Sequence, residues 1–203
     1  MNDQEIEVKF SVSDLEAIRI RLEQLGAQLT QPRTLELNLR YDTSDGELSR
    51  SFRVLRLRQD TAARLTFKGP ARAQDGARIR QEIEMVVESF EQAQALLAAL
   101  GYQVNMVYEK YRTKYEFEGV HLDLDQMPYG NFIELEGSDV PALHSLSDRL
   151  GLDWEASSPA SYVMLFEALR MKMNLPFRDL SFKNFSNLRV LPADMGLVPA
   201  DKV

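Results

Sequence analysis

The sequence of 203 residues contains no cysteine, which excludes disulfide bonds and thiolate metal sites. It contains only two histidines, His121 and His144, and neither has the spacing of a metal-ligand pair. No apolar run approaches the roughly 20 residues of a membrane-spanning helix, and the first residues lack the basic start of a secretory signal. We therefore expect a cytoplasmic protein without a membrane partner.

Positive charge is also in short supply, since the formal net charge is −7. This balance argues against a nucleic acid polymer as partner, because nonspecific binding to a phosphate backbone needs a broad excess of Lys and Arg. A local anion site stays open, because the basic residues can be concentrated in one place. The length and the apolar content of 44% are ordinary for a globular chain.

A doublet of carboxylates separated by one apolar residue occurs three times, and a helical pattern follows each copy. The copies are Glu5-Ile6-Glu7, Glu82-Ile83-Glu84 and Glu134-Leu135-Glu136. Residues two apart in a strand share a face, so each doublet directs both carboxylates to the same side. Paired carboxylates are typical ligands of hard cations such as Mg²⁺ or Mn²⁺.

Strand-like alternation dominates the chain, with charged residues of both signs on one face. Such a face usually meets water, and that is the alternative interpretation here. The high density of charge and the capped helices available to cover the apolar faces favour an α+β fold instead. In that fold a closed antiparallel β-barrel has a charged interior and helices packed outside. Strands are predicted over 5–10, 53–58, 64–68, 78–84, 110–116, 122–125 and 132–136, and helices are predicted to begin at Ser13, Ser89, Ser138 or Asp139, and Ser158.

Charges enclosed in such an interior need partners or a ligand. Arg matches phosphate oxygens with two parallel hydrogen bonds, and carboxylates hold the divalent metals that bridge phosphates. The presence of both signs therefore indicates a metal–polyphosphate ligand.

Short motifs along the chain resemble those of the CYTH superfamily, the triphosphate tunnel metalloenzymes. Glu5-Ile6-Glu7-Val8-Lys9 resembles the ExExK signature, and the resemblance covers roughly residues 4 to 170. We assign residues 1–172 to this domain and 173–203 to a C-terminal extension. The other segments that match in order are Arg40-Tyr41-Asp42-Thr43, Leu55-Arg56-Leu57-Arg58, Leu65-Thr66-Phe67-Lys68-Gly69-Pro70, Arg80-Gln81-Glu82-Ile83-Glu84, Glu109-Lys110-Tyr111-Arg112, Leu122-Asp123-Leu124-Asp125, the Gly130–Gly137 strand and Ser161-Tyr162.

The resemblance implies an eight-stranded antiparallel tunnel with helices outside, which binds a triphosphate moiety with Mg²⁺ or Mn²⁺. It implies that Glu5, Glu7, Lys9 and Glu134 are catalytic. The implied metal ligands are Glu5, Glu7, Asp125, Glu134 and Glu136, with Glu82 and Glu84 either contacting the metal or supporting its ligands. The implied substrate-binding residues are Lys9, Arg56, Arg58, Lys68, Arg80, Lys110 and Arg112.

The sequence leaves the orientation or role of several residues undecided. Asp125 is favoured over Asp123 as the inward-facing metal ligand of their strand. Arg78 lies either at the tunnel mouth or in solvent, and Tyr162 either bonds a phosphate or packs in its helix. The extension after residue 172 either caps one tunnel entrance or mediates a homodimer.

Three functions fit this scaffold. The first is hydrolysis of tripolyphosphate, ATP or thiamine triphosphate; the second is a class IV adenylyl cyclase that forms cyclic AMP and pyrophosphate; the third is a noncatalytic polyphosphate-binding module. The His-Phe pair of characterised cyclases is replaced by Thr34-Leu35-Glu36-Leu37, and Asn38 stands where Asp is frequent. Hydrolysis is therefore the favoured function.

Overall fold

A computed structural model describes the backbone from Gln4 to Asp201 and the side chains from Ile6 onward. The strands are β1 (Gln4–Val12), β2 (Gln28–Asp42), β3 (Val54–Gln59), β4 (Ala63–Lys68), β5 (Arg72–Gln74), β6 (Ala77–Val87), β7 (Gln103–Phe117), β8 (Val120–Met127) and β9 (Gly130–Gly137). The helices are α1 (Leu15–Leu25), α2 (Glu47–Arg50), α3 (Phe90–Ala99), α4 (Val140–Arg149), α5 (Tyr162–Met173) and α6 (Phe182–Phe185), with short 3₁₀ turns η1 (Trp154–Ala156) and η2 (Pro192–Met195).

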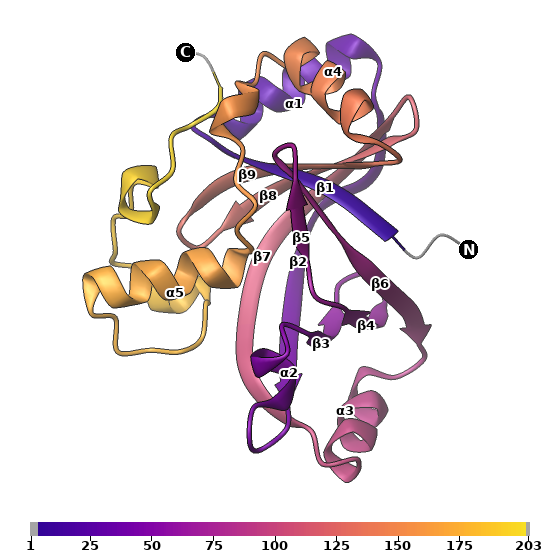
Figure 1. Cartoon of the computed structure of the whole chain (residues 1–203), viewed down its shortest axis with the longest axis vertical. Helices are drawn as coiled ribbons and strands as arrows, with labels where there is room; N and C mark the ends of the chain where they lie inside the picture. The colour runs from indigo at the N-terminus through magenta and orange to yellow at the C-terminus, as the bar shows by residue number, and fades with distance from the viewer. Residues whose placement is uncertain (1–3, 202–203) are drawn as a thin grey trace.

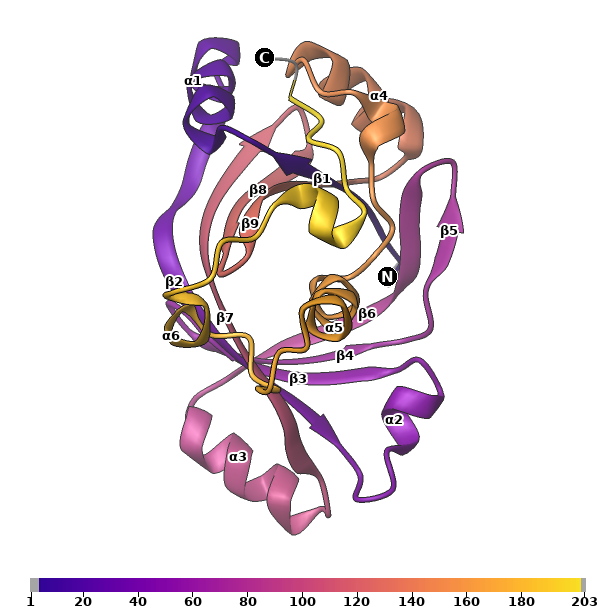
Figure 2. The ribbon, with the colours of Figure 1, turned by 90° about the vertical axis from the view of Figure 1, so that its left-hand side faces the viewer.

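The strands form one antiparallel sheet in the order β1-β9-β8-β7-β2-β3-β4-β6-β5. A further pairing of β1 with β6 closes eight of them into a ring (Figures 1 and 2). The α+β class and the ring of antiparallel strands predicted from the sequence are thereby confirmed. Strand β5 lies outside the ring and extends a hairpin from β6, and the alternation pattern did not predict it.

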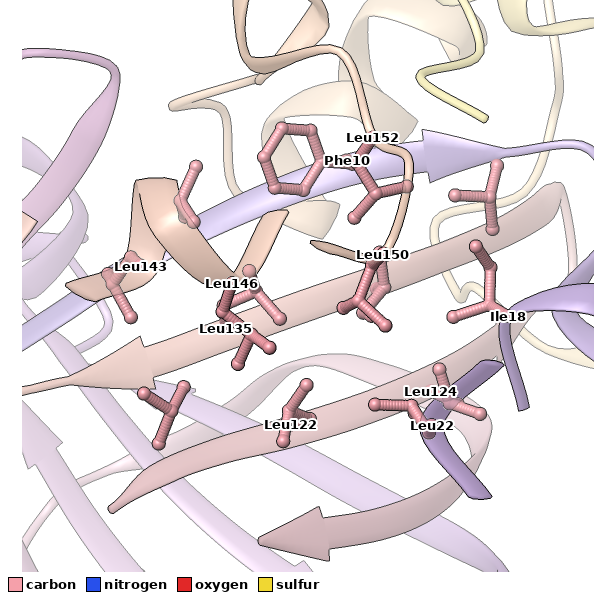
Figure 3. Packing of buried hydrophobic residues seen from close by; sticks show 14 of the residues in the cluster. Phe10, Ile18, Leu22, Leu122, Leu124, Leu135, Leu143, Leu146, Leu150 and Leu152 are labelled. Carbon is pink, nitrogen blue, oxygen red and sulfur yellow. The ribbon is translucent and has the colours of Figure 1, made fainter. Parts of the chain in front are cut away.

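Apolar residues on the outer face of the ring pack against helices. One core cluster joins α1 and α4 to strands β1, β8 and β9, with Ile18, Leu22, Leu143 and Leu150 fully buried (Figure 3). A second, smaller cluster places α3 against β2 and β3. Burying a Leu or Ile side chain contributes about 1.5–3 kcal/mol, so these helices stabilise the wall without entering its interior.

Local sequence signals explain where these helices begin, with two corrections. Helix α1 begins after Asp14 rather than after the predicted Ser13, because the Asp14 carboxylate accepts hydrogen bonds from the amides of residues 16 and 17. The fourth predicted helix, α5, is capped by Ser161 rather than opened at Ser158. The amide of Ser158 donates to the carbonyl of Lys9, which keeps that segment extended along β1.

Helix α5 covers one opening of the ring (Figure 2), whereas the prediction placed every helix outside. Its Phe166 and Leu169 join a buried cluster with Tyr108 and Phe132. These two strand residues have the same alternation phase as Lys110 and Glu134, so they belong to the inward face of the wall. The inward face is therefore charged along part of its length and apolar where α5 seals it.

The segment after α5 wraps around this helix and returns to the sheet. Leu180 exchanges backbone hydrogen bonds with β7, and Phe185 packs against Phe166 and Phe177. The amide of Ala200 donates to the carbonyl of Ser11. Among the described residues, no helix combines the length and the apolarity that crossing a bilayer would require.

Candidate functional site

The ring encloses a cavity of about 490 Å³ whose wall is mostly polar. Ten basic and six acidic side chains line it, which leaves an excess of four positive charges in a chain whose net charge is −7. The basic residues are Lys9, Arg40, Arg56, Arg58, Lys68, Arg78, Arg80, Lys110, Arg112 and Lys114, and the acidic residues are Glu7, Glu82, Glu84, Asp123, Glu134 and Glu136.

All seven basic residues predicted to bind substrate therefore lie in one wall. Their role in binding stays a prediction, but their convergence is a structural fact. Arg78 faces the cavity and contacts Glu7 at 3.4 Å, which settles its location. Arg40 and Lys114 were absent from the predicted set, although Lys114 shares the strand phase of Lys110 and Arg112 on β7. Arg40 lies on β2, a strand that contributed no residue to that set.

Acidic residues of neighbouring strands stand directly opposite each other. Glu7 on β1 is the register partner of Glu136 on β9, and Glu134 on β9 is the partner of Asp123 on β8. Like charges in directly opposite positions destabilise a sheet unless a cation separates them. The side chain of Glu5, predicted to be catalytic and a metal ligand, lies outside the described residues; its backbone pairs with Arg80.

Asp125 is fully buried behind the cavity wall, where it joins three side chains. It accepts hydrogen bonds from Lys110 Nζ at 3.0 Å, from Arg112 Nε at 2.6 Å and from the Tyr162 hydroxyl at 2.7 Å. Both carboxylate oxygens are occupied by these donors. Asp125 thus fixes the direction of two cavity cations and ties them to α5, and its predicted role as a metal ligand stays a prediction.

Glu134 bridges two basic residues across the wall. Its oxygens lie 3.0 Å from Lys9 Nζ and 2.5 Å from Arg112 Nη2. Burial alone would raise the pKa of Glu134, but Lys9 and Arg112 hold it well below the usual range. Lys9 also donates to the carbonyl of Ala160 at 3.1 Å and lies 4.2 Å from the centre of the Tyr162 ring. These contacts keep the Glu134 carboxylate ionised and fix the position of the Lys9 side chain.

The two carboxylates of the β6 doublet, Glu82 and Glu84, contact basic side chains of the strands β3 and β4. Glu84 accepts hydrogen bonds from Arg58 at 3.2 Å and from the Thr66 hydroxyl at 2.8 Å, and Glu82 lies 2.5 Å from Lys68 Nζ. Coulombic attraction from Arg58, against the opposing effect of burial, lowers the pKa of Glu84. This doublet therefore orients basic side chains, and its predicted role at the metal stays a prediction.

Sequence reasoning gave no role to Glu36 on β2, which is completely buried beneath the wall. Its oxygens lie 3.6 Å from Lys110 Nζ and 3.9 Å from Arg58 Nη1, and neither accepts a hydrogen bond within the described part of the chain. Burial opposes ionisation, yet Lys110, Arg112 and Arg58 lower its pKa. The alternation of Glu36 with Leu35 and Leu37 was the available signal.

Comparisons with known proteins agree with this architecture. The family model described as "CYTH domain" matches residues 3–142. A "Putative adenylate cyclase" of Methanocaldococcus jannaschii is 26% identical over 136 residues, which cover 66% of this chain and 77% of that protein.

Solved structures show the same fold. A putative adenylate cyclase of Vibrio parahaemolyticus has a TM-score of 0.70 at 22% identity, covering 80% of this chain and 97% of that one. A putative adenylyl cyclase of Hippeastrum, described as having a dominant triphosphatase activity, has a TM-score of 0.63 at 20% identity, covering 81% and 95%. With more than half of its length matched by the family model and a charged ring of the same architecture, this chain belongs to the CYTH domain family.

Proposed function

We propose that this chain is a metal-dependent enzyme that binds a triphosphate moiety in the charged cavity and hydrolyses a phosphoanhydride bond. The observation that carries the proposal is the convergence of ten basic side chains on one cavity of an acidic protein. Only six acidic side chains line the same cavity within the described residues, and the buried Asp125 and Glu36 behind the wall offset part of the remaining excess. Such a concentration of Arg and Lys is costly without an anion, and Arg in particular forms paired hydrogen bonds with phosphate oxygens. A linear triphosphate supplies several negative charges in a narrow shape.

The acidic residues fit a divalent cation such as Mg²⁺ or Mn²⁺. Glu7 and Glu136 are direct cross-strand neighbours, as are Asp123 and Glu134, and hard divalent cations prefer carboxylate oxygens. Within the described residues no three acidic or histidine side chains already converge on one point, and Glu134 is paired with Lys9. We assign Glu7, Glu134 and Glu136 as the ligands. A bound divalent cation would neutralise charge on the phosphate oxygens and orient them.

The protein's own residues then account for binding and orientation. Lys9, Arg56 and Arg112 lie in the cavity wall, where they would hold nonbridging oxygens and stabilise the charge that develops on the leaving phosphate. Asp125, buried behind the wall, and Glu84, within the wall, would keep the guanidinium groups in position. Helix α5 closes one opening of the ring, which limits the access of bulk water.

The cavity wall favours hydrolysis over cyclisation. Apart from charged residues and Ser161, the described wall includes only a few groups that a nucleobase could contact, namely Val54, Val163 and the rings of Tyr108, His121 and Tyr162. The hydroxyl of Tyr162 is already committed to Asp125. Sites that bind bases usually offer apolar or aromatic surface, whereas a cyclase must hold both adenine and ribose. The dominant triphosphatase activity described for the Hippeastrum protein is consistent with this choice.

Adenylyl cyclase activity is the second candidate, because all three proteins compared above are named as putative adenylate or adenylyl cyclases. Product analysis separates the two reactions. Purified protein should release orthophosphate from tripolyphosphate or ATP when Mg²⁺ or Mn²⁺ is added, and EDTA should stop the release. Cyclic AMP and pyrophosphate as the sole products from ATP would assign the cyclase reaction instead. Tight binding without turnover would indicate a noncatalytic binding module.

A further inference from the structure

Arg40 differs from most of the basic residues that line the cavity. Eight of those ten residues have a carboxylate oxygen within 4.0 Å. For Arg40 and Lys114 no such contact occurs within the described part of the chain. Lys114 at least has Asp123 as its register partner on β8, whereas the register partners of Arg40 are Met106 on β7 and Arg56 on β3. Arg40 is thus the cavity cation that is least compensated by neighbouring carboxylates.

The surroundings of Arg40 are themselves cationic. Arg56 stands directly opposite it, and like charges in that position repel. Burial, with further contributions from Arg56 and Arg80, lowers the pKa of Arg40 despite the opposing effects of Tyr108 and Asp42. The Asp42 carboxylate is occupied elsewhere, because it accepts hydrogen bonds from the amides of residues 48 and 49 and from the Ser49 hydroxyl.

On the two strands that flank Arg40, β7 and β3, the row of inward-facing charged residues ends at or before the level of Arg40. The next inward-phase residue on β7 beyond Tyr108 is Met106, which is buried in the cluster beneath α5. Beyond Arg56 on β3 the corresponding residue is Val54. Beyond this level Lys68 on β4, the register partner of Val54, is already paired with Glu82 at 2.5 Å. Among the described residues, Arg40 is therefore the last cation in this direction without an ion-paired carboxylate, and this position suits the end of an anionic chain rather than its middle.

We propose that Arg40, together with Arg56 and Arg80, forms an oxyanion subsite that holds the free terminal phosphoryl group of the ligand. The inference rests on the proposed function, because it takes the ligand to be a phosphate chain. A terminal phosphoryl group has three nonbridging oxygens and more negative charge than an internal or esterified one. Guanidinium groups match such oxygens with paired hydrogen bonds. Arg40 would thus select ligands with an unblocked phosphate end.

The test measures binding by titration calorimetry in EDTA, which removes the metal that turnover requires. The two ligands are inorganic tripolyphosphate and a dinucleoside triphosphate, whose phosphate ends are both esterified. Arg40→Met should weaken tripolyphosphate binding about tenfold or more, as expected for loss of a charge-assisted contact. It should leave the weaker binding of the blocked ligand nearly unchanged. Lys114→Met removes the other cavity cation that has no ion-paired carboxylate in the described part of the chain. It should weaken the binding of both ligands by a similar factor.

Thermal unfolding without ligand separates binding from a structural role. Arg40→Met should unfold at the same or a higher temperature than the wild type, because it removes a charge that faces Arg56. Arg40→Lys should bind tripolyphosphate with intermediate affinity. Equal losses in Arg40→Met and Lys114→Met, or equal losses for the free and blocked ligands, would overturn the subsite. If the wild type itself bound no tripolyphosphate in EDTA or with Ca²⁺, the proposed function would fail rather than the subsite alone.

Discussion

The hydroxyl of Tyr162 connects helix α5 to the charged wall, and its removal isolates one interaction. The oxygen donates to Asp125 at 2.7 Å in a buried setting. In Tyr162→Phe the ring would remain, together with its edge contact to Phe132 at 5.2 Å and its position 4.2 Å from Lys9 Nζ. Asp125 would also keep its bonds to Lys110 and Arg112, so the variant removes a single hydrogen bond without opening a large cavity.

A hydrogen bond to a charged acceptor contributes about 1.5–3 kcal/mol to stability, and the lower part of that range applies because Asp125 keeps other donors. We expect Tyr162→Phe to lower the free energy of unfolding by about 2 kcal/mol. For a chain of this size that corresponds to a decrease in Tm of roughly 4–8 °C. The assay is urea unfolding followed by the fluorescence of Trp154, the single tryptophan, whose ring lies 5.9 Å from that of Phe10.

The matched control is Tyr129→Phe. Tyr129 is also buried, but its hydroxyl donates to a neutral acceptor, the backbone carbonyl of Tyr162, at 2.8 Å. A neutral hydrogen bond contributes about 1 kcal/mol, so this variant should cost about half as much. If Tyr129→Phe destabilised the protein as much as Tyr162→Phe, the charge of Asp125 would have no special part in anchoring α5 and the reasoning would be refuted.

Three further predictions follow from other contacts. Glu7→Gln and Glu134→Gln should each lower turnover of the triphosphate substrate by about a hundredfold or more while the far-UV circular dichroism stays unchanged; near-normal rates would remove their assigned role as metal ligands. The folded-state pKa values of Glu36 and Glu134 are lowered, so the stability they contribute is complete above their ordinary pKa of about 4 and should decrease as pH falls further; a flat acid titration of unfolding free energy would contradict this. Deletion of everything after Met173 removes buried side chains such as Phe185 and should lower Tm by more than about 10 °C, measured by calorimetry, whereas an unchanged Tm would show that α5 is held without it.

Much of the ring could be predicted because its strands carry a period of two with charges on one face. That pattern is clear in β3, β4 and β6, and it correctly placed Arg56, Lys68 and Arg80 in one wall. Strand β2 was not predicted from alternation. Pro32 and two register shifts between Leu29 and Thr34 interrupt its period, so its inward-facing residues were read only as departures from a family motif.

The contribution of α5 could not be derived from the sequence for a different reason. Helical spacing identifies a helix and its apolar face, but it does not say which surface that face covers. Along β9 the inward-facing residues change from the charged Glu134 to the apolar Phe132 at the next inward position. Along β7 they change from Lys110 to Tyr108 and Met106. These aromatic and apolar positions were the only sequence signal that part of the interior is sealed by a helix, and they resemble ordinary outward-facing core residues.

The closing strand of the ring comes from the very beginning of the chain. Strand β1 pairs on one side with β6 and on the other with β9, where Lys9 stands opposite Glu134. During synthesis this first strand has no partner for its second edge until β9 has left the ribosome, so the slow step of folding should be the capture of β1 by β9. A nascent chain lacking β9 would carry two open strand edges and would expose apolar residues of β8 such as Leu122 and Leu124, which makes it a natural client for chaperones.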